Sequence, residues 1–254
     1  MAGFAQLSSP TSSERLRRYP QVSLYIHDYS WTRLDPHIRR KILALFPKRQ
    51  DVELGMMASP PGWFATVYAH QYAELGVAGR AAHVNGVLAY PMDVWKEMVA
   101  SARHNGFSSI APIMSPNSGQ FASYPFDSSH WDYLRLAALI GGGLTTDSPS
   151  RFFLEQKPEY RQFVEQELIW AKQHHLHASF IVSPGTSGTN FRAQTDEVVS
   201  ELQKAGAIPD EFIVENYEPD PKPGYVNIVG GEDQNSTVAS VALSIAEKPY
   251  LSQK

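Results

Sequence analysis

The sequence predicts an α/β protein, a single-domain (β/α)8 barrel, and two observations carry this prediction. Short apolar, β-rich runs alternate with segments of helical periodicity almost from end to end, which is typical of βαβ units and a parallel sheet. About eight such units fit into 254 residues, the usual size of one α/β barrel. An open, doubly wound parallel sheet is the alternative, because the third and fifth strands carry the faintest signals. We expect one domain over residues 1–254, with residues 1–20 as a peripheral N-terminal segment.

Eight runs are expected to form the strands, and each closes on polar or turn-forming residues. The runs are 22–26, 52–57, 83–89, 109–114, 144–146, 178–182, 212–214 and 226–229. No Gly-x-Gly-x-x-Gly follows the first of them, which disfavours a dinucleotide-binding Rossmann domain.

Helical periodicity fills the intervals between these runs. The first helix has Asp35 as its expected N-cap and Pro36 at its first position. Further helices are expected near 68–75, from Pro91 to the Asn105-Gly106 stop, from Ser128 or Ser129 to the glycines at 141–143, over 159–174, over 195–205 and over 238–245.

Composition excludes several classes of partner and site. The net charge of -4 gives no electrostatic footprint for nucleic acid or an anionic membrane, and no apolar run approaches the roughly 20 residues that span a bilayer. The absence of cysteine excludes disulfides, thiolate metal sites and a cysteine nucleophile. No cofactor motif is evident, so the leading interpretation includes no cofactor and no metal ligand. Compartment stays open: periplasmic or secreted if a signal peptide was removed, cytoplasmic otherwise. Oligomeric state is not indicated.

Carboxylates stand at the ends of two late strands. In α/β barrels the loops after the strands share one face, and that face carries the site. Glu215 follows Phe-Ile-Val directly, and a carboxylate at the mouth of a barrel costs free energy unless it is hydrogen-bonded or functional. Asp147 follows the fifth strand. Helix capping or pairing with an arginine is the structural alternative for Glu215, and a turn or helix start is the alternative for Asp147.

Other polar and aromatic residues near strand ends are expected to bind the substrate. Flat rings beside hydrogen-bonding groups suit the mixed apolar and hydroxylated surfaces of sugars. These residues are His27, Asp28, Trp63, Asn85, Asn117, Asn216 and Tyr217.

Two carboxylates at the C-terminal mouth predict a carbohydrate-active hydrolase that cleaves a glycosidic bond, with Asp147 and Glu215 as the catalytic pair. With Glu215-Asn216 at a late strand end, the chain resembles (β/α)8-barrel glycoside hydrolases, and this resemblance implies a carbohydrate substrate. The best-known clan carries an Asn-Glu pair after the fourth strand. Here that place holds Ser115-Pro116-Asn117 and no acid, so no specific family is identified.

Two other functions stay open at this point. A divalent-metal phosphodiesterase or sugar isomerase would use oxygen and nitrogen ligands from His27, Asp28, Asp147 and Glu215. Against it, the early strands show no close ligand pair such as His-x-His. A barrel that binds glycans without turnover would use the same residue types as a hydrolase.

Overall fold

A computed structural model describes most of the regular elements of the chain. The described residues are 24–27, 35–45, 50–54, 80–114, 128–148, 153–154, 158–183, 191–215 and 238–248. They belong to two compact units. One unit comprises residues 1–22, 147–170 and 179–254, and the other comprises residues 23–146 and 171–178. We call these the Glu215 unit and the His83 unit, and each is described by itself.

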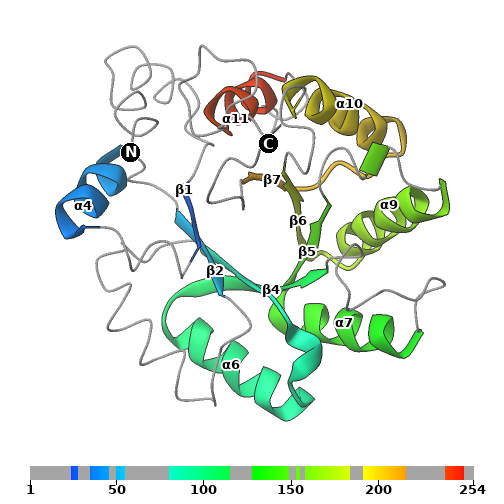
Figure 1. The fold of residues 1–254 in the computed structure, drawn as a ribbon. Helices are drawn as coiled ribbons and strands as arrows, with labels where there is room; N and C mark the ends of the chain where they lie inside the picture. Colours follow the sequence, from blue (N-terminus) through cyan, green and yellow to red (C-terminus); the bar gives the residue numbers. More distant parts are fainter. Residues whose placement is uncertain are drawn as a thin grey trace, which may run out of the picture. The chain divides into compact units, whose positions relative to one another are not determined.

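Among the described residues, seven parallel strands follow one another in chain order (Figure 1). They are β1 Leu24–His27, β2 Gln50–Leu54, β3 Arg80–Val84, β4 Phe107–Met114, β5 Gly143–Asp147, β6 His177–Val182 and β7 Glu211–Val214. The pairings β1–β2, β2–β3, β3–β4, β4–β5 and β6–β7 are all parallel. The prediction of an α/β fold with a parallel sheet is therefore confirmed.

Helices lie between these strands along the chain. They are α4 Pro36–Leu45, α6 Met92–His104, α7 Ser128–Gly141, α9 Pro158–Gln173, α10 Phe191–Lys204 and α11 Val238–Ala246, with the short 3-10 helix η1 at Val87–Ala89. Within the described part of the chain, no helix is both long enough and apolar enough to cross a membrane. The expected helix near 68–75 and the expected eighth strand at 226–229 lie outside the described residues.

The start of α4 follows the sequence prediction. Asp35 Oδ1 accepts hydrogen bonds from the backbone N–H groups of His37, at 2.8 Å, and Ile38, at 3.4 Å. These donors have no partner inside the helix, so the carboxylate satisfies them as an N-cap.

The glycines at the end of α7 let the chain approach β4 closely. A Cβ atom on Gly141 would lie 1.8 Å from the carbonyl oxygen of Ile110, so no larger residue fits without movement of the backbone. Gly142 has a φ of 82°, in the left-handed region that glycine adopts without strain. The helix stop predicted from these glycines is confirmed.

The predicted third strand, 83–89, was misplaced. The strand β3 ends at Val84, and residues Val87–Ala89 form the 3-10 helix η1. Gly86, with a φ of 72°, turns the chain between the two elements, and this glycine interrupts an apolar run that otherwise reads as a strand. Consequently His83 lies inside the strand, while Asn85 lies in the turn that follows it.

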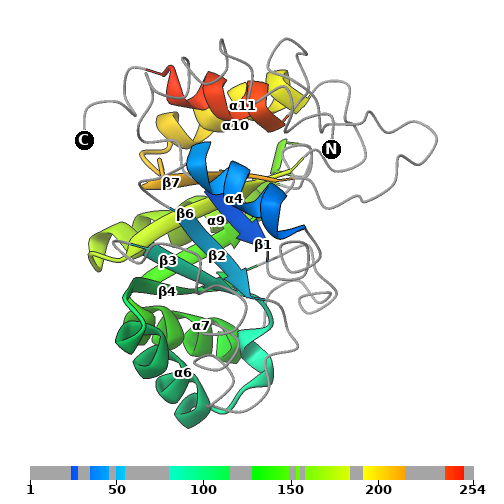
Figure 2. The ribbon, with the colours of Figure 1, turned by 90° about the vertical axis from the view of Figure 1, so that its left-hand side faces the viewer.

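In the His83 unit, α6 and α7 pack against β4 (Figures 1 and 2). Trp95 is fully buried, and its indole Nε1–H donates to the carbonyl oxygen of Ala137 at 2.9 Å. Arg103 Nη2 donates to the carbonyl oxygen of Ile140 at 2.8 Å. These two bonds join α6 to the C-terminal part of α7.

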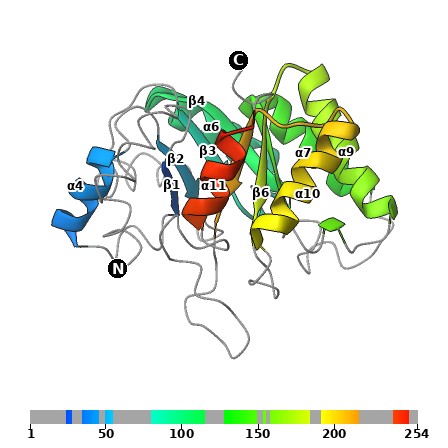
Figure 3. The ribbon, with the colours of Figure 1, turned by 90° about the horizontal axis from the view of Figure 1, so that it is seen from above.

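In the Glu215 unit, α10 and α11 lie side by side (Figure 3), and α11 packs against β7 (Figure 1). Asp196 on α10 joins the two helices, because its Oδ1 atom accepts a hydrogen bond from Ser244 Oγ at 3.1 Å and lies 2.8 Å from Lys248 Nζ. Phe180 on β6 lies edge-on to Phe153, with ring centroids 5.7 Å apart, and also meets Phe212 of β7.

Candidate functional site

One face of the sheet in the His83 unit carries polar side chains. Successive side chains of a strand point to opposite faces, and residues paired in a parallel sheet share a face. Tyr25 pairs with Asp51, and Glu53, two residues further, pairs with His83. By the same alternation, His83 shares its face with Ala111, Ile113 and hence Thr145. The opposite face carries the buried apolar side chains of Val52, Ala82, Val84, Ile110, Met114 and Leu144.

Asp51, the second residue of β2, is a fully buried carboxylate. Its exposed fraction is 0%, and its Oδ1 atom accepts a hydrogen bond from the backbone N–H of Ala81 at 2.9 Å. Because Ala81 belongs to the neighbouring strand β3, this bond holds the carboxylate in one position beside that strand. A buried carboxylate costs free energy unless such partners compensate it.

His83 on β3 is also fully buried and contacts two other strands. Its Nδ1 atom lies 2.7 Å from Oγ1 of Thr145 on β5, which is itself fully buried. The ring of Tyr25 on β1 meets the imidazole edge-on, with centroids 5.3 Å apart and an angle of 62° between the planes. These contacts hold the imidazole in one orientation.

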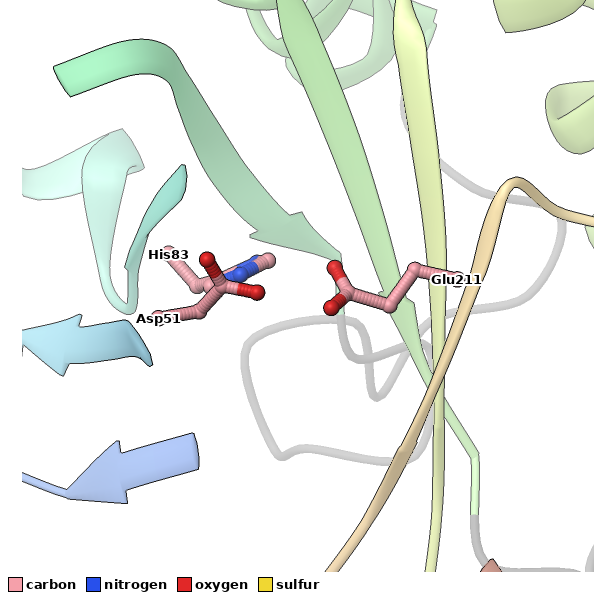
Figure 4. A group of neighbouring side chains, drawn as sticks. All are labelled: Asp51, His83 and Glu211. Carbon is pink, nitrogen blue, oxygen red and sulfur yellow. The ribbon is translucent and has the colours of Figure 1, made fainter. Parts of the chain in front are cut away.

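Asp51 and His83 lie next to each other. A carboxylate oxygen of Asp51 and a ring nitrogen of His83 are within 4.8 Å of one another. Figure 4 shows the two side chains projecting in the same direction from β2 and β3. Glu211, drawn in the same figure, belongs to the Glu215 unit. The pair therefore combines an oxygen and a nitrogen ligand at one buried place in the His83 unit.

The Glu215 unit places its two predicted catalytic carboxylates on either side of β6. Asp147 is the last residue of β5, and the next residue, Ser148, donates its backbone N–H to the carbonyl oxygen of Ile181 at 3.2 Å. Glu215 directly follows β7 and donates its backbone N–H to the carbonyl oxygen of Val182 at 3.1 Å. Both carboxylate residues are half-buried.

These hydrogen bonds put Asp147 and Glu215 on one face of the sheet. In a parallel pair of strands, when the N–H of residue i bonds to the carbonyl oxygen of residue j, residue i lies opposite residue j+1 of the neighbouring strand. Asp147 therefore lies opposite Ile181, and Glu215 lies opposite Ser183, two residues further along the chain and directly after β6. Strand geometry then separates the two backbones by roughly 10 Å across the sheet and roughly 6–7 Å along it.

Two more polar contacts lie in the same unit. Ser179 Oγ on β6 donates to Glu211 Oε2 on β7 at 3.1 Å. Tyr160 on α9 is buried, and this burial raises the pKa of its phenol above the ordinary value, as does the charge of Asp147, while the hydroxyl of Ser148 acts in the opposite direction. The phenol beside Asp147 is therefore neutral around pH 7.

The remaining predicted site residues are described only in part. His27 is the last residue of β1, and Asn85 is a half-buried residue of the turn after β3. Asp28, Trp63, Asn117, Asn216 and Tyr217 lie outside the described residues.

The sequence reasoning missed Asp51 as a site residue. It started the second strand at Val52, whereas β2 begins at Gln50. A signal was present, because Asp51 and Glu53 alternate with Val52 and Leu54 in the pattern of a strand with one polar face. A polar residue near the start of a strand is easily mistaken for part of the preceding loop, and the predicted strand therefore left Asp51 out.

Comparison with known proteins gives a likeness in fold. No protein-family model and no curated protein matches the sequence. Among solved structures, a variant of the carboxyl transferase domain of Rhizobium etli pyruvate carboxylase, with pyruvate, is similar at a TM-score of 0.53 and 11% identity, over 92% of this chain and 42% of that one. The same domain without the substitution gives a TM-score of 0.50 at 12% identity, over 88% of this chain and 39% of that one. The chain thus spans less than half the length of these two structures, and the likeness shows a shared fold.

Proposed function

We propose that this protein is a carbohydrate-active hydrolase that cleaves a glycosidic bond with Asp147 and Glu215. The main support for the proposal is the position of these two residues. Both stand at the carboxyl ends of strands, on one face of the sheet and on opposite sides of β6. Glycoside hydrolysis needs two carboxyl groups on either side of the scissile bond, with room between them for the sugar.

The reaction requires a different role for each carboxyl group. One, in its acid form, protonates the glycosidic oxygen as the bond to the anomeric carbon breaks. The other either attacks the anomeric carbon or removes a proton from the water that does so. In both cases the oxygen of water ends on the anomeric carbon, and one of its hydrogens ends on the leaving hydroxyl. The neutral phenol of Tyr160 adds no charge beside Asp147.

We further propose that the strands close into a (β/α)8 barrel. Seven parallel strands in chain order support this arrangement, with residues 226–229 as the eighth strand. In such a barrel the sugar would contact His27, Asp28, Trp63, Asn85, Asn117, Asn216 and Tyr217, the residues expected from the sequence.

The test is a panel of polysaccharides and phosphodiesters, incubated with the full chain in the presence and absence of EDTA. We expect release of reducing sugars from one class of polysaccharide, and its loss in Asp147→Asn and Glu215→Gln. The matched control is Glu197→Gln, which changes an exposed carboxylate on α10 of the same unit. Cleavage of phosphodiesters alone, or binding of a polysaccharide without products, would overturn the proposal.

A further inference from the structure

We infer that Asp51 and His83 supply two ligands of a divalent-cation site in the His83 unit. This site was not expected from the sequence, and it involves neither Asp147 nor Glu215. It therefore stands independently of carbohydrate hydrolysis.

Asp51 and His83 bring a carboxylate and an imidazole together at one buried place. Asp51 and His83 are each 0% exposed, and their ligand atoms lie within 4.8 Å of each other (Figure 4). Two ligands of one ion, each about 2.0–2.2 Å from it, cannot be more than about 4.4 Å apart. A separation up to 4.8 Å thus needs only a small side-chain adjustment to hold an ion. A cation at this place would also offset the cost of burying the carboxylate.

Polar contacts hold the side chains of both His83 and Asp51 in position. A histidine that binds a metal usually donates its other ring N–H to a hydrogen-bond acceptor, which sets the tautomer and the ring orientation. His83 Nδ1 lies 2.7 Å from Thr145 Oγ1, so Nε2 is the atom with which His83 would bind the ion. Asp51 Oδ1 is held in the same way by the N–H of Ala81. Both ligands thus have the supporting contacts that a metal site needs.

Asp51 and His83 lie on the face of the sheet that carries polar side chains in this unit. The inward positions of α/β barrels are usually filled by branched apolar side chains. Here the shared face of β1, β2, β3 and β5 places Tyr25, Asp51, His83 and Thr145 together. An ordinary core would not concentrate a carboxylate, an imidazole and a hydroxyl at buried strand positions, with the half-buried Tyr25 beside them.

The donor atoms indicate the class of ion. One imidazole and one carboxylate suit Zn²⁺, Mn²⁺ or Fe²⁺ better than Ca²⁺, which prefers oxygen ligands alone. Binding requires the neutral imidazole and the ionised carboxylate, so affinity should fall as the solution is acidified.

The experiment measures metal binding by the full chain without any substrate. Metal-stripped protein is titrated with Zn²⁺ and with Mn²⁺ by calorimetry, and Co²⁺ serves as a visible-absorption probe. We expect one bound ion per chain, and loss of that binding in Asp51→Asn and His83→Gln. The control variants, Asp132→Asn on α7 and His104→Gln on α6, change exposed residues of the same unit and should bind as the unchanged protein does.

A further variant keeps the test decisive if the ligand variants fail to fold. Thr145→Ser retains the hydroxyl beside His83, whereas Thr145→Val removes it. Loss of such a supporting contact weakens metal binding by roughly 10- to 100-fold, so only Thr145→Val should show this decrease. The proposal is overturned if the unchanged protein binds none of the three ions, or if the ion remains bound with equal affinity in folded Asp51→Asn or His83→Gln. Because activity is not measured, failure here is distinguishable from failure of the proposed hydrolase.

Discussion

His83 Nδ1 lies 2.7 Å from Thr145 Oγ1, and this contact joins β3 to β5 across the intervening strand β4. Both residues are fully buried. A contact between positions 62 residues apart in the sequence therefore sets the orientation of the imidazole beside Asp51.

Removal of this hydrogen bond should destabilise the protein. Thr145→Val keeps the shape of the side chain but leaves a buried imidazole without its hydroxyl partner, which costs about 1–3 kcal/mol. Urea denaturation should show a lower free energy of unfolding for Thr145→Val than for Thr145→Ser. Equal values for the two variants would show that the contact contributes nothing to stability.

The close approach of the end of α7 to β4 makes Gly141 intolerant of a side chain. In Gly141→Ala the new Cβ would lie 1.8 Å from the carbonyl oxygen of Ile110, so the backbone has to shift. We expect destabilisation of about 3 kcal/mol or more, at the upper end of overpacking effects. The control is Gly206→Ala, where the new Cβ would have no neighbouring atom within 4 Å. Only the positive φ of 71° then costs free energy, about 1–2 kcal/mol. Thermal unfolding that ranks the two variants in the opposite order contradicts this account.

The N-cap of α4 contributes a smaller amount. Asp35→Ala removes the acceptor for the N–H groups of His37 and Ile38 and should cost about 1 kcal/mol. Asp35→Ser keeps an oxygen acceptor and should retain most of the stability. Chemical denaturation of both variants measures the difference, and no loss in Asp35→Ala would mean that water satisfies these donors equally well.

Burial of Tyr160 predicts a loss of stability in alkaline solution. Its pKa is raised in the folded protein, first by burial, so the folded state keeps the phenolic proton after the unfolded chain begins to lose it near pH 10. The unfolded state then binds fewer protons, and the free energy of unfolding falls as pH rises above about 10. Tyr160→Phe should show a shallower decrease between pH 9 and 11 in urea titrations. Parallel curves for the two proteins would contradict this role of the phenol.

Local patterns predicted most of the fold. Alternating periodicities located most of the described strands, and the glycines at 141–143 and the carboxylate of Asp35 marked the ends of helices where the structure has them. The third strand was misplaced because Gly86 breaks an apolar run whose two halves adopt different structures.

The candidate site was predictable only in its backbone positions. The ends of β5 and β7 placed Asp147 and Glu215, since a strand end is a local property of the sequence. The neighbourhood of Asp51, His83 and Thr145 depends on strand register between distant segments. No local sequence pattern specifies how strands that are distant in the sequence align. A shift of one residue in that alignment moves every side chain of a strand to the opposite face.

The rate of reducing-sugar formation tests the central claim most directly. It is measured with EDTA on the polysaccharide that the unchanged protein degrades, for that protein, Glu215→Gln and Glu197→Gln. We predict a decrease of roughly 100- to 10,000-fold for Glu215→Gln, the usual contribution of a general acid or base, and an unchanged rate for Glu197→Gln. Equal rates for all three proteins, or no sugar release from any polysaccharide, would contradict the assignment of Glu215 as a catalytic carboxylate.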